Sequence, residues 1–156
     1  MGKNRDVMNL QVKEIMSTKV RKVTPDTTVE EAAKLMAEYD VSYLLIVDDT
    51  KLSGIITEDD IIKKVVIGSR SPKSIKVSDI MVKEVIHAKP DTDIEDAADI
   101  MTKKKIKKLP IVESNKLIGI ITAMDLVAAE PKIMNSIGEL FLFAKKQPQQ
   151  QQQVAG

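Results

Sequence analysis

The feature that most constrains the fold of this chain is an internal repeat. The segment Gly54–Asp60 (GIITEDD) returns 65 residues later as Gly119–Asp125 (GIITAMD). With the same offset and no gap, 21 of 49 positions are identical between residues 12–60 and residues 77–125. Such self-similarity means that one structural unit is written twice, so function has to be read from an object with two related halves.

Composition limits what the two halves can be. The chain has 156 residues, of which 43% are hydrophobic and only 3% aromatic, so the core must be built from aliphatic side chains and Met. A unit of about 50 to 60 residues is close to the lower limit for independent folding, which predicts that each half needs the other. The net charge of +1 gives no general bias toward nucleic acid or membrane.

Several function classes are excluded by residues that the sequence lacks. It has no Cys, so disulfides, thiolate catalysis and Cys-based zinc sites are impossible. His87 is the only His, and the carboxylates form no metal or acid–base motif, so we expect no enzyme, no cofactor and no metal. No apolar run approaches the ~20 residues of a membrane span, and the N-terminus lacks the apolar region of a signal peptide. We therefore expect a cytoplasmic protein.

The hydrophobic periodicity changes in a fixed order within the first repeat. A Pro-Asp-Thr-Thr turn predicts a helix start, with Thr27 or Thr28 as N-cap. Short apolar runs flanking an Asp-Asp-Thr-Lys turn predict a β-hairpin. The expected elements are a strand at 20–23, a helix that begins near Val29, strands at 43–47 and 52–57, and a helix at 58–66.

The second repeat gives the same order of elements. Strands are expected at 85–88, 109–112 and 117–122, and helices at 94–104 and 123–129. Each repeat is therefore a β-α-β-β-α unit, and the fold class is α+β. The predicted organisation is a first repeat at 8–67, a linker at 68–76, a second repeat at 77–131, a C-terminal helix at 132–146 and a disordered tail at 147–156.

The C-terminal helix is predicted from an apolar stripe. Its members recur at helical spacing and include both Phe residues of the chain in the same segment. The stripe can pack on its own domain, or it can extend a dimer interface or dock a partner. Its residues are Ile133, Ile137, Leu140, Phe141 and Ala144.

The repeated Gly-Ile-Ile-Thr-x-x-Asp motif has two interpretations. In the structural one, Thr57 or Thr122 is the N-cap of the next helix, and Asp60 or Asp125 completes a capping box. Capping alone does not require the preceding Gly or the Ile-Ile pair. In the functional one, the same strand-to-helix junction binds an anion at the helix N-terminus, and the carboxylate accepts hydrogen bonds from two adjacent ribose hydroxyls. Gly then permits close backbone approach.

The duplicated β-α-β-β-α unit, the Ile-Met near each start and the Gly-Ile-Ile-Thr-x-x-Asp motif together resemble the CBS (cystathionine β-synthase) domain, over about residues 8–130. The resemblance implies two repeats related by a pseudo-two-fold axis, with clefts that bind adenosine nucleotides, most often AMP, ADP or ATP. It also implies that Asp60 and Asp125 hold ribose and that Thr57 and Thr122 contact ribose or phosphate.

The resemblance further implies which residues line each cleft. Lys83, Glu84 and Val85, with Lys107 and Lys108, are expected opposite Asp60. Lys19 and Val20, with Ser42 and Tyr43, are expected opposite Asp125. Only the first set carries a lysine pair at the position where the family often has basic residues that reach phosphate. The Asp60 cleft is therefore predicted to be the stronger phosphate binder.

The function expected from these observations is a stand-alone regulatory module that senses adenosine nucleotides, forms a homodimer and acts on an effector protein. Three alternatives stay open: a scaffold whose clefts bind no ligand, a module for S-adenosylmethionine, and a nucleic-acid-binding module that uses the lysine run at 103–108. That run lacks the interleaved aromatic or Arg residues of nucleic-acid sites, and its first lysines suit a helix C-terminus.

Overall fold

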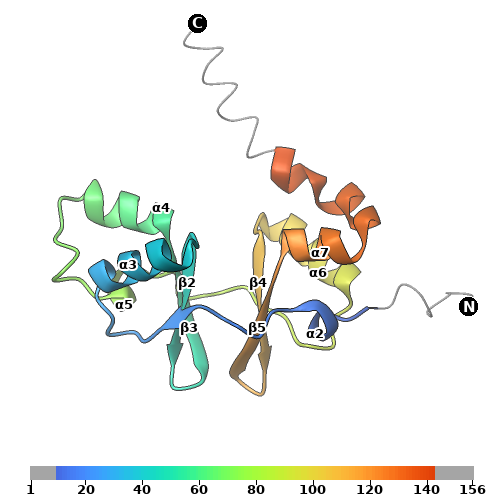
Figure 1. The fold of residues 1–156 in the computed structure, drawn as a ribbon, viewed down its shortest axis with the longest axis horizontal. Coiled ribbons are helices and arrows are strands. Elements are labelled where there is room, and N and C mark those ends of the chain that lie inside the picture. The colour runs from blue at the N-terminus through green and yellow to red at the C-terminus, as the bar shows by residue number, and fades with distance from the viewer. Residues whose placement is uncertain (1–9, 143–156) are drawn as a thin grey trace, which may run out of the picture. The chain divides into compact units, whose positions relative to one another are not determined.

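The computed structural model describes residues 10–142 (Figure 1). It contains helices and short sheets, and the α+β class with two related repeats and a C-terminal helix is confirmed. In order, the elements are α2 (Val12–Ile15), β1 (Lys22–Val23), α3 (Val29–Tyr39), β2 (Tyr43–Asp48), β3 (Lys51–Thr57), α4 (Glu58–Ile61), η1 (Ile62–Val66), α5 (Val77–Ile80), α6 (Ile94–Lys104), β4 (Lys108–Glu113), β5 (Lys116–Thr122), α7 (Ala123–Ala129), η2 (Pro131–Ile133) and a helix over 134–142.

The chain divides into two compact units. The first unit consists of Lys19–Ile86 with Val112–Ile118, and the second, within the described residues, of 10–18, His87–Ile111 and 119–142. Neither unit coincides with one sequence repeat. The first unit includes Val112–Ile118 of the second repeat, and the second unit includes residues 12–18 of the first repeat. Each unit therefore contains residues of both repeats. The expectation that each repeat needs the other stays a prediction.

The first unit is built on a three-stranded sheet in the order β1-β2-β3. Strand β1 pairs parallel to β2, and β2 pairs antiparallel to β3 through the predicted hairpin. All but the last residue of β2 are buried, as its continuous apolar run predicts. Thr28 is the N-cap of α3 and accepts a hydrogen bond from the Glu31 N–H at 3.1 Å.

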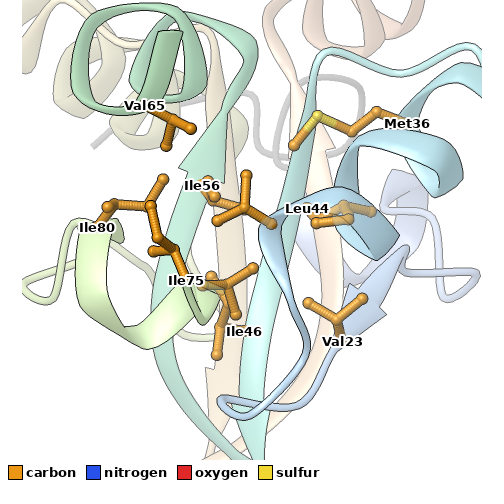
Figure 2. Close-up of a cluster of buried hydrophobic side chains, with 11 residues drawn as sticks. Val23, Met36, Leu44, Ile46, Ile56, Val65, Ile75 and Ile80 are labelled. Atoms are coloured by element: carbon orange, nitrogen blue, oxygen red, sulfur yellow. The ribbon is translucent and has the colours of Figure 1, made fainter. Parts of the chain in front are cut away.

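The core of the first unit is entirely aliphatic apart from Met (Figure 2). Side chains from the sheet meet side chains from the helices at its centre, and none of the described residues buries a charged or polar side chain there. Complete burial of a Leu or Ile side chain stabilises a fold by about 1.5–3 kcal/mol. The labelled members of this cluster are Val23, Met36, Leu44, Ile46, Ile56, Val65, Ile75 and Ile80.

The short helix at the start of each repeat packs in the unit of the other repeat. In the second unit, the Val12 N–H of α2 donates to the Thr92 carbonyl at 2.8 Å, and Ser17 forms a bridge with Ile120. In the first unit, the Val77 N–H of α5 donates to the Thr27 carbonyl at 2.8 Å. Val12 and Val77 are both fully buried, so each helix anchors its segment through an apolar side chain. We call α2 and α5, with the residues that follow them, the exchanged segments, because each packs in the unit of the other repeat. The local periodicity of the sequence did not predict this exchange.

The strand expected at 85–88 does not form, and this expectation was wrong. The segment makes only an isolated parallel bridge between Ala88 and Ile111. In the first repeat, the Leu45 N–H donates to the Arg21 carbonyl at 3.0 Å and helps to hold β1. The position 65 residues after Leu45 is Pro110, which has no N–H and cannot donate the corresponding bond.

The second helix of the first repeat needs adjustment, because the segment expected as a helix at 58–66 is α-helical only to Ile61 and continues as the π-helix η1. Within the segment expected as a linker, Ile75 is buried, and its carbonyl accepts a hydrogen bond from the Val29 N–H at 2.9 Å. Helices α6 and α7 have the expected bounds.

The C-terminal stripe packs on its own unit. Ile133, Ile137 and Leu140 are buried, and the Thr102 hydroxyl of α6 donates to the Ser136 carbonyl at 3.2 Å. The stripe therefore completes the core of the second unit in the described part of the helix. Residues 1–9, Ala144, the end of the predicted helix and the predicted tail lie outside the described residues.

Candidate functional site

The first candidate site is the junction at which β3 ends and α4 begins. Thr57 has extended backbone geometry and is the N-cap of α4. Its hydroxyl oxygen accepts a hydrogen bond from the Asp60 N–H at 3.2 Å. In return, Asp60 Oδ2 accepts hydrogen bonds from the Thr57 N–H and from the Thr57 hydroxyl, each at 3.0 Å. This capping box fixes the carboxylate against the junction.

The second candidate site repeats this geometry where β5 ends and α7 begins. The Thr122 side chain accepts a hydrogen bond from the Asp125 N–H at 3.1 Å, and the Thr122 N–H donates to Asp125 Oδ2 at 2.9 Å. The capping interpretation is thus correct for both copies. It does not exclude the functional one, because in both boxes the capping contacts of the carboxylate fall on Oδ2. We call the pairs Thr57–Asp60 and Thr122–Asp125 the two Thr–Asp junctions.

A junction of this kind suits a vicinal diol. Its carboxylate has a second oxygen, Oδ1, that can accept further hydrogen bonds, and hydrogen bonds to charged acceptors are stronger than neutral ones. The capping contacts hold the carboxylate in place before a ligand arrives, which lowers the entropic cost of binding. Both Asp residues are partly exposed, so a ligand can reach them from solvent.

Asp60 makes an electrostatic contact with a lysine that follows it by four residues. Asp60 Oδ1 lies 3.4 Å from the Lys64 Nζ, with the Asp60 side chain 15% and the Lys64 side chain 44% exposed. The position equivalent to Lys64 in the second repeat is Ala129, which has no charge. Sequence reasoning missed Lys64, although its spacing of four residues from Asp60 on a predicted helix is typical of an ion pair.

Lys63, the residue before Lys64, contacts a different carboxylate. Lys63 Nζ lies 2.9 Å from Asp59 Oδ2, and this hydrogen bond raises the pKa of the Lys63 ammonium above its ordinary value. Both side chains of this pair are largely exposed, so the pair contributes little to stability. Lys63 and Lys64 therefore have the same charge but contact different carboxylates.

Some predicted site residues lie beside the junction of their own repeat. The Glu58 N–H donates to the Ser42 carbonyl at 2.9 Å, and Tyr43 pairs with Thr57 in the β2–β3 ladder. In the second unit, the Ala123 N–H donates to the Lys107 carbonyl at 2.9 Å. The Lys107 ammonium lies 5.6 Å from the centre of the Phe141 ring, a cation–π contact with the C-terminal helix.

For the remaining predicted site residues, the structure gives the unit, bridge or strand to which each belongs. In the first unit, Lys83 follows the bridge between Ile55 and Val82. Lys19, Val20 and Val85 also belong to the first unit, and Lys108 is the first residue of β4. The grouping of Lys83, Val85, Lys107 and Lys108 with Asp60, and of Lys19, Val20, Ser42 and Tyr43 with Asp125, stays a prediction.

The glycine of each motif has a structural role that sequence reasoning did not assign. A Cβ on Gly54 would lie 2.5 Å from the Met81 Sδ and 2.9 Å from the Val82 carbonyl oxygen. A Cβ on Gly119 would lie 2.5 Å from the Met16 Sδ and 3.0 Å from the Ser17 carbonyl oxygen. The close backbone approach that glycine permits is therefore made by the exchanged segment of the chain itself.

Metal binding and membrane insertion find no support in residues 10–142. No group of three or more His, Asp or Glu side chains there could hold a metal ion. Within the same residues, every helix is too short or too polar to cross a bilayer.

Comparisons with known proteins agree with this geometry. The family model for the CBS domain matches residues 12–67 and 77–132. An uncharacterized protein of Methanocaldococcus jannaschii is 38% identical over 121 residues, which cover 76% of this chain and 65% of that protein. The CBS domain-containing protein YhcV of Bacillus subtilis is 36% identical over 115 residues, which cover 74% of this chain and 81% of that protein.

Solved structures point the same way. The crystal structure of CBSX2 in complex with AMP superposes with a TM-score of 0.69 and 30% identity, and the match covers 79% of this chain and 97% of that one. The two family matches coincide with the two copies of the internal repeat, including both Thr–Asp junctions. This chain therefore belongs to the CBS domain family and carries a tandem pair of CBS domains.

Proposed function

We propose that this CBS pair is a regulatory module that binds an adenosine nucleotide, AMP, ADP or ATP, and passes the signal to an effector protein. The observation that carries the proposal is the pair of Thr–Asp junctions, in which the capping contacts fall on one carboxylate oxygen and a ribose diol can use the other. A relative of known structure binds AMP, which supports the choice of ligand.

The roles of individual residues follow from their chemistry. Asp60 and Asp125 would accept hydrogen bonds from ribose, and Thr57 and Thr122 would hold these carboxylates in place. Lys107 and Lys108, with Lys83, are the proposed phosphate contacts, because an ammonium is a compact donor that attracts a phosphate at long range. Binding would act by favouring one of two conformations of the pair, since a ligand shifts an equilibrium only by its differential affinity.

A panel of ligands tests this function on the intact protein. AMP, ADP or ATP at 100 times its Kd is expected to stabilise the fold by about 2.7 kcal/mol, because the ligand binds only the folded state. Thermal unfolding with each nucleotide, with S-adenosylmethionine and with a single-stranded oligonucleotide reports this as a shift in midpoint. A shift with S-adenosylmethionine alone, or with the oligonucleotide alone in a salt-sensitive manner, would replace the proposed ligand. No shift with any of them would favour a scaffold.

We also propose a homodimer. The π-helix η1 and the residue after it expose three large apolar side chains, with Ile62 51%, Val66 65% and Ile67 72% exposed. Burying such side chains against a second copy would remove apolar area from water. Sedimentation equilibrium is expected to give twice the chain mass of 17.3 kDa, and Val66→Glu is expected to lower it. A chain that stays monomeric at high concentration contradicts this state.

A further inference from the structure

The two Asp carboxylates of the Thr–Asp junctions are not equally available to a ligand. In the first junction, Asp60 Oδ2 already accepts two hydrogen bonds from Thr57, so a diol must donate to Oδ1. That oxygen lies 3.4 Å from the Lys64 ammonium. The same ammonium donates to the Ile80 carbonyl at the end of α5 at 2.8 Å. Lys64 thus connects Asp60 to the exchanged helix and faces the oxygen that the ligand needs.

The second repeat has no lysine at the position equivalent to Lys64. Ala129 stands 65 residues after Lys64 and offers no cation to Asp125. The backbone differs as well, because Lys64 lies in the π-helix η1, whereas α7 remains α-helical through Ala129. Short π segments are rare and occur frequently at functional sites. The asymmetry therefore involves both a side chain and the helix that presents it.

We propose that Lys64 is an affinity-determining residue that competes with the ribose diol for Asp60 Oδ1. This proposal rests on the proposed function. The diol shares Oδ1 with the ammonium or displaces it. If all other contacts of the two junctions are equal, ribose therefore binds less tightly at Asp60 than at Asp125. The effect concerns ribose alone and is separate from any attraction between lysines and phosphate. The competing ion pair is partly exposed, so its removal is expected to change affinity up to about fivefold.

The test uses adenosine, which has the diol but no phosphate, and the full chain with Asp125→Asn so that the first junction is read alone. In this background, Lys64→Met is expected to lower the Kd for adenosine by about three- to fivefold. Lys63→Met is the matched control, because it removes the same charge from the adjacent residue, whose partner is Asp59. It is expected to leave the Kd unchanged. With 2′-deoxyadenosine, which lacks one hydroxyl of the diol, the gain from Lys64→Met is expected to shrink.

The converse substitution transfers the contact to the second repeat. With Asp60→Asn in the background, Ala129→Lys is expected to raise the Kd for adenosine by a similar factor, because it places an ammonium four residues after Asp125.

The outcomes separate this proposal from the proposed function. If adenosine binds but its Kd for Lys64→Met equals or exceeds its Kd for Lys63→Met, the proposed competition is overturned and the proposed nucleotide binding stands. If neither adenosine nor AMP binds to the wild-type protein or to Lys64→Met, both proposals are overturned. Circular dichroism of each variant checks that the fold is kept.

Discussion

Val12→Asp is expected to lower the free energy of unfolding by about 4 kcal/mol or more, because it places an unpaired charge at a fully buried position. The loss should appear in the second unit although Val12 belongs to the first repeat, since α2 packs there through its bonds to Thr92 and the bridge between Ser17 and Ile120. Hydrogen exchange should show lost protection first at α6 and at the end of β5. Denaturant unfolding gives the size of the effect.

Val77→Asp is the mirror experiment, because Val77 is equally buried at the equivalent position of the second repeat. It should first expose the amides of β2 and β3 in the first unit. Lys13→Asp adds the same carboxylate at an exposed position next to Val12 and is expected to cost little. If Val12→Asp does not fold, Val12→Ala gives the same pattern with a smaller loss. Protection lost first in β2 and β3 of a Val12 variant would contradict the exchange of segments.

Gly54→Ala and Gly119→Ala are each expected to destabilise the fold by about 1–3 kcal/mol, because the added methyl group overpacks a filled site. Neither glycine has a positive φ, so the cost is steric and not conformational. At Gly54 the obstacle includes the Val82 carbonyl oxygen at 2.9 Å, which is backbone and cannot rotate away. At Gly119 the nearest backbone atom is slightly farther, at 3.0 Å, so its loss is expected to be the smaller of the two.

Gly138→Ala provides a control of opposite sign. Gly138 lies in the helix at 134–142, and a Cβ there would meet only the Met134 Sδ, at 4.0 Å. Replacing glycine by alanine inside a helix is expected to stabilise it by about 0.5–1 kcal/mol. Thermal or urea unfolding of the three variants measures the differences. A Gly54→Ala protein as stable as the wild type would show that the exchanged segment does not pack tightly on β3.

Much of the fold follows from local sequence because each repeat places turn residues between apolar runs of strand length. The hairpins and helices α6 and α7 were predictable on this basis. The lost strand at 85–88 depended on one missing N–H at Pro110, which becomes significant only when the register with the preceding segment is known. The packing of α2 and α5 in the opposite units was not predictable, since periodicity shows which face is buried but not against what.

The candidate site was predictable to a similar degree. The Thr-x-x-Asp spacing gave the capping boxes, because it reflects one turn of helix. The contact of Lys64 with Asp60 was within reach of the same reasoning, as a pair four residues apart. Its bond to the Ile80 carbonyl was not, because it depends on the position of the exchanged helix. The close approach at Gly54 and Gly119 was not predictable either, because it depends on where the exchanged segments pack.

We propose that the two Thr–Asp junctions bind the ribose of an adenosine nucleotide. Isothermal titration of AMP into the wild-type protein, Asp60→Asn, Asp125→Asn and the double variant tests it most directly, because Asn can still accept the capping hydrogen bond from the Thr N–H. Removing the charge that receives the ribose hydroxyls is expected to weaken each site about tenfold or more, and the double variant should show no binding in the range of the wild type. Wild-type affinity in a correctly folded double variant would contradict the account.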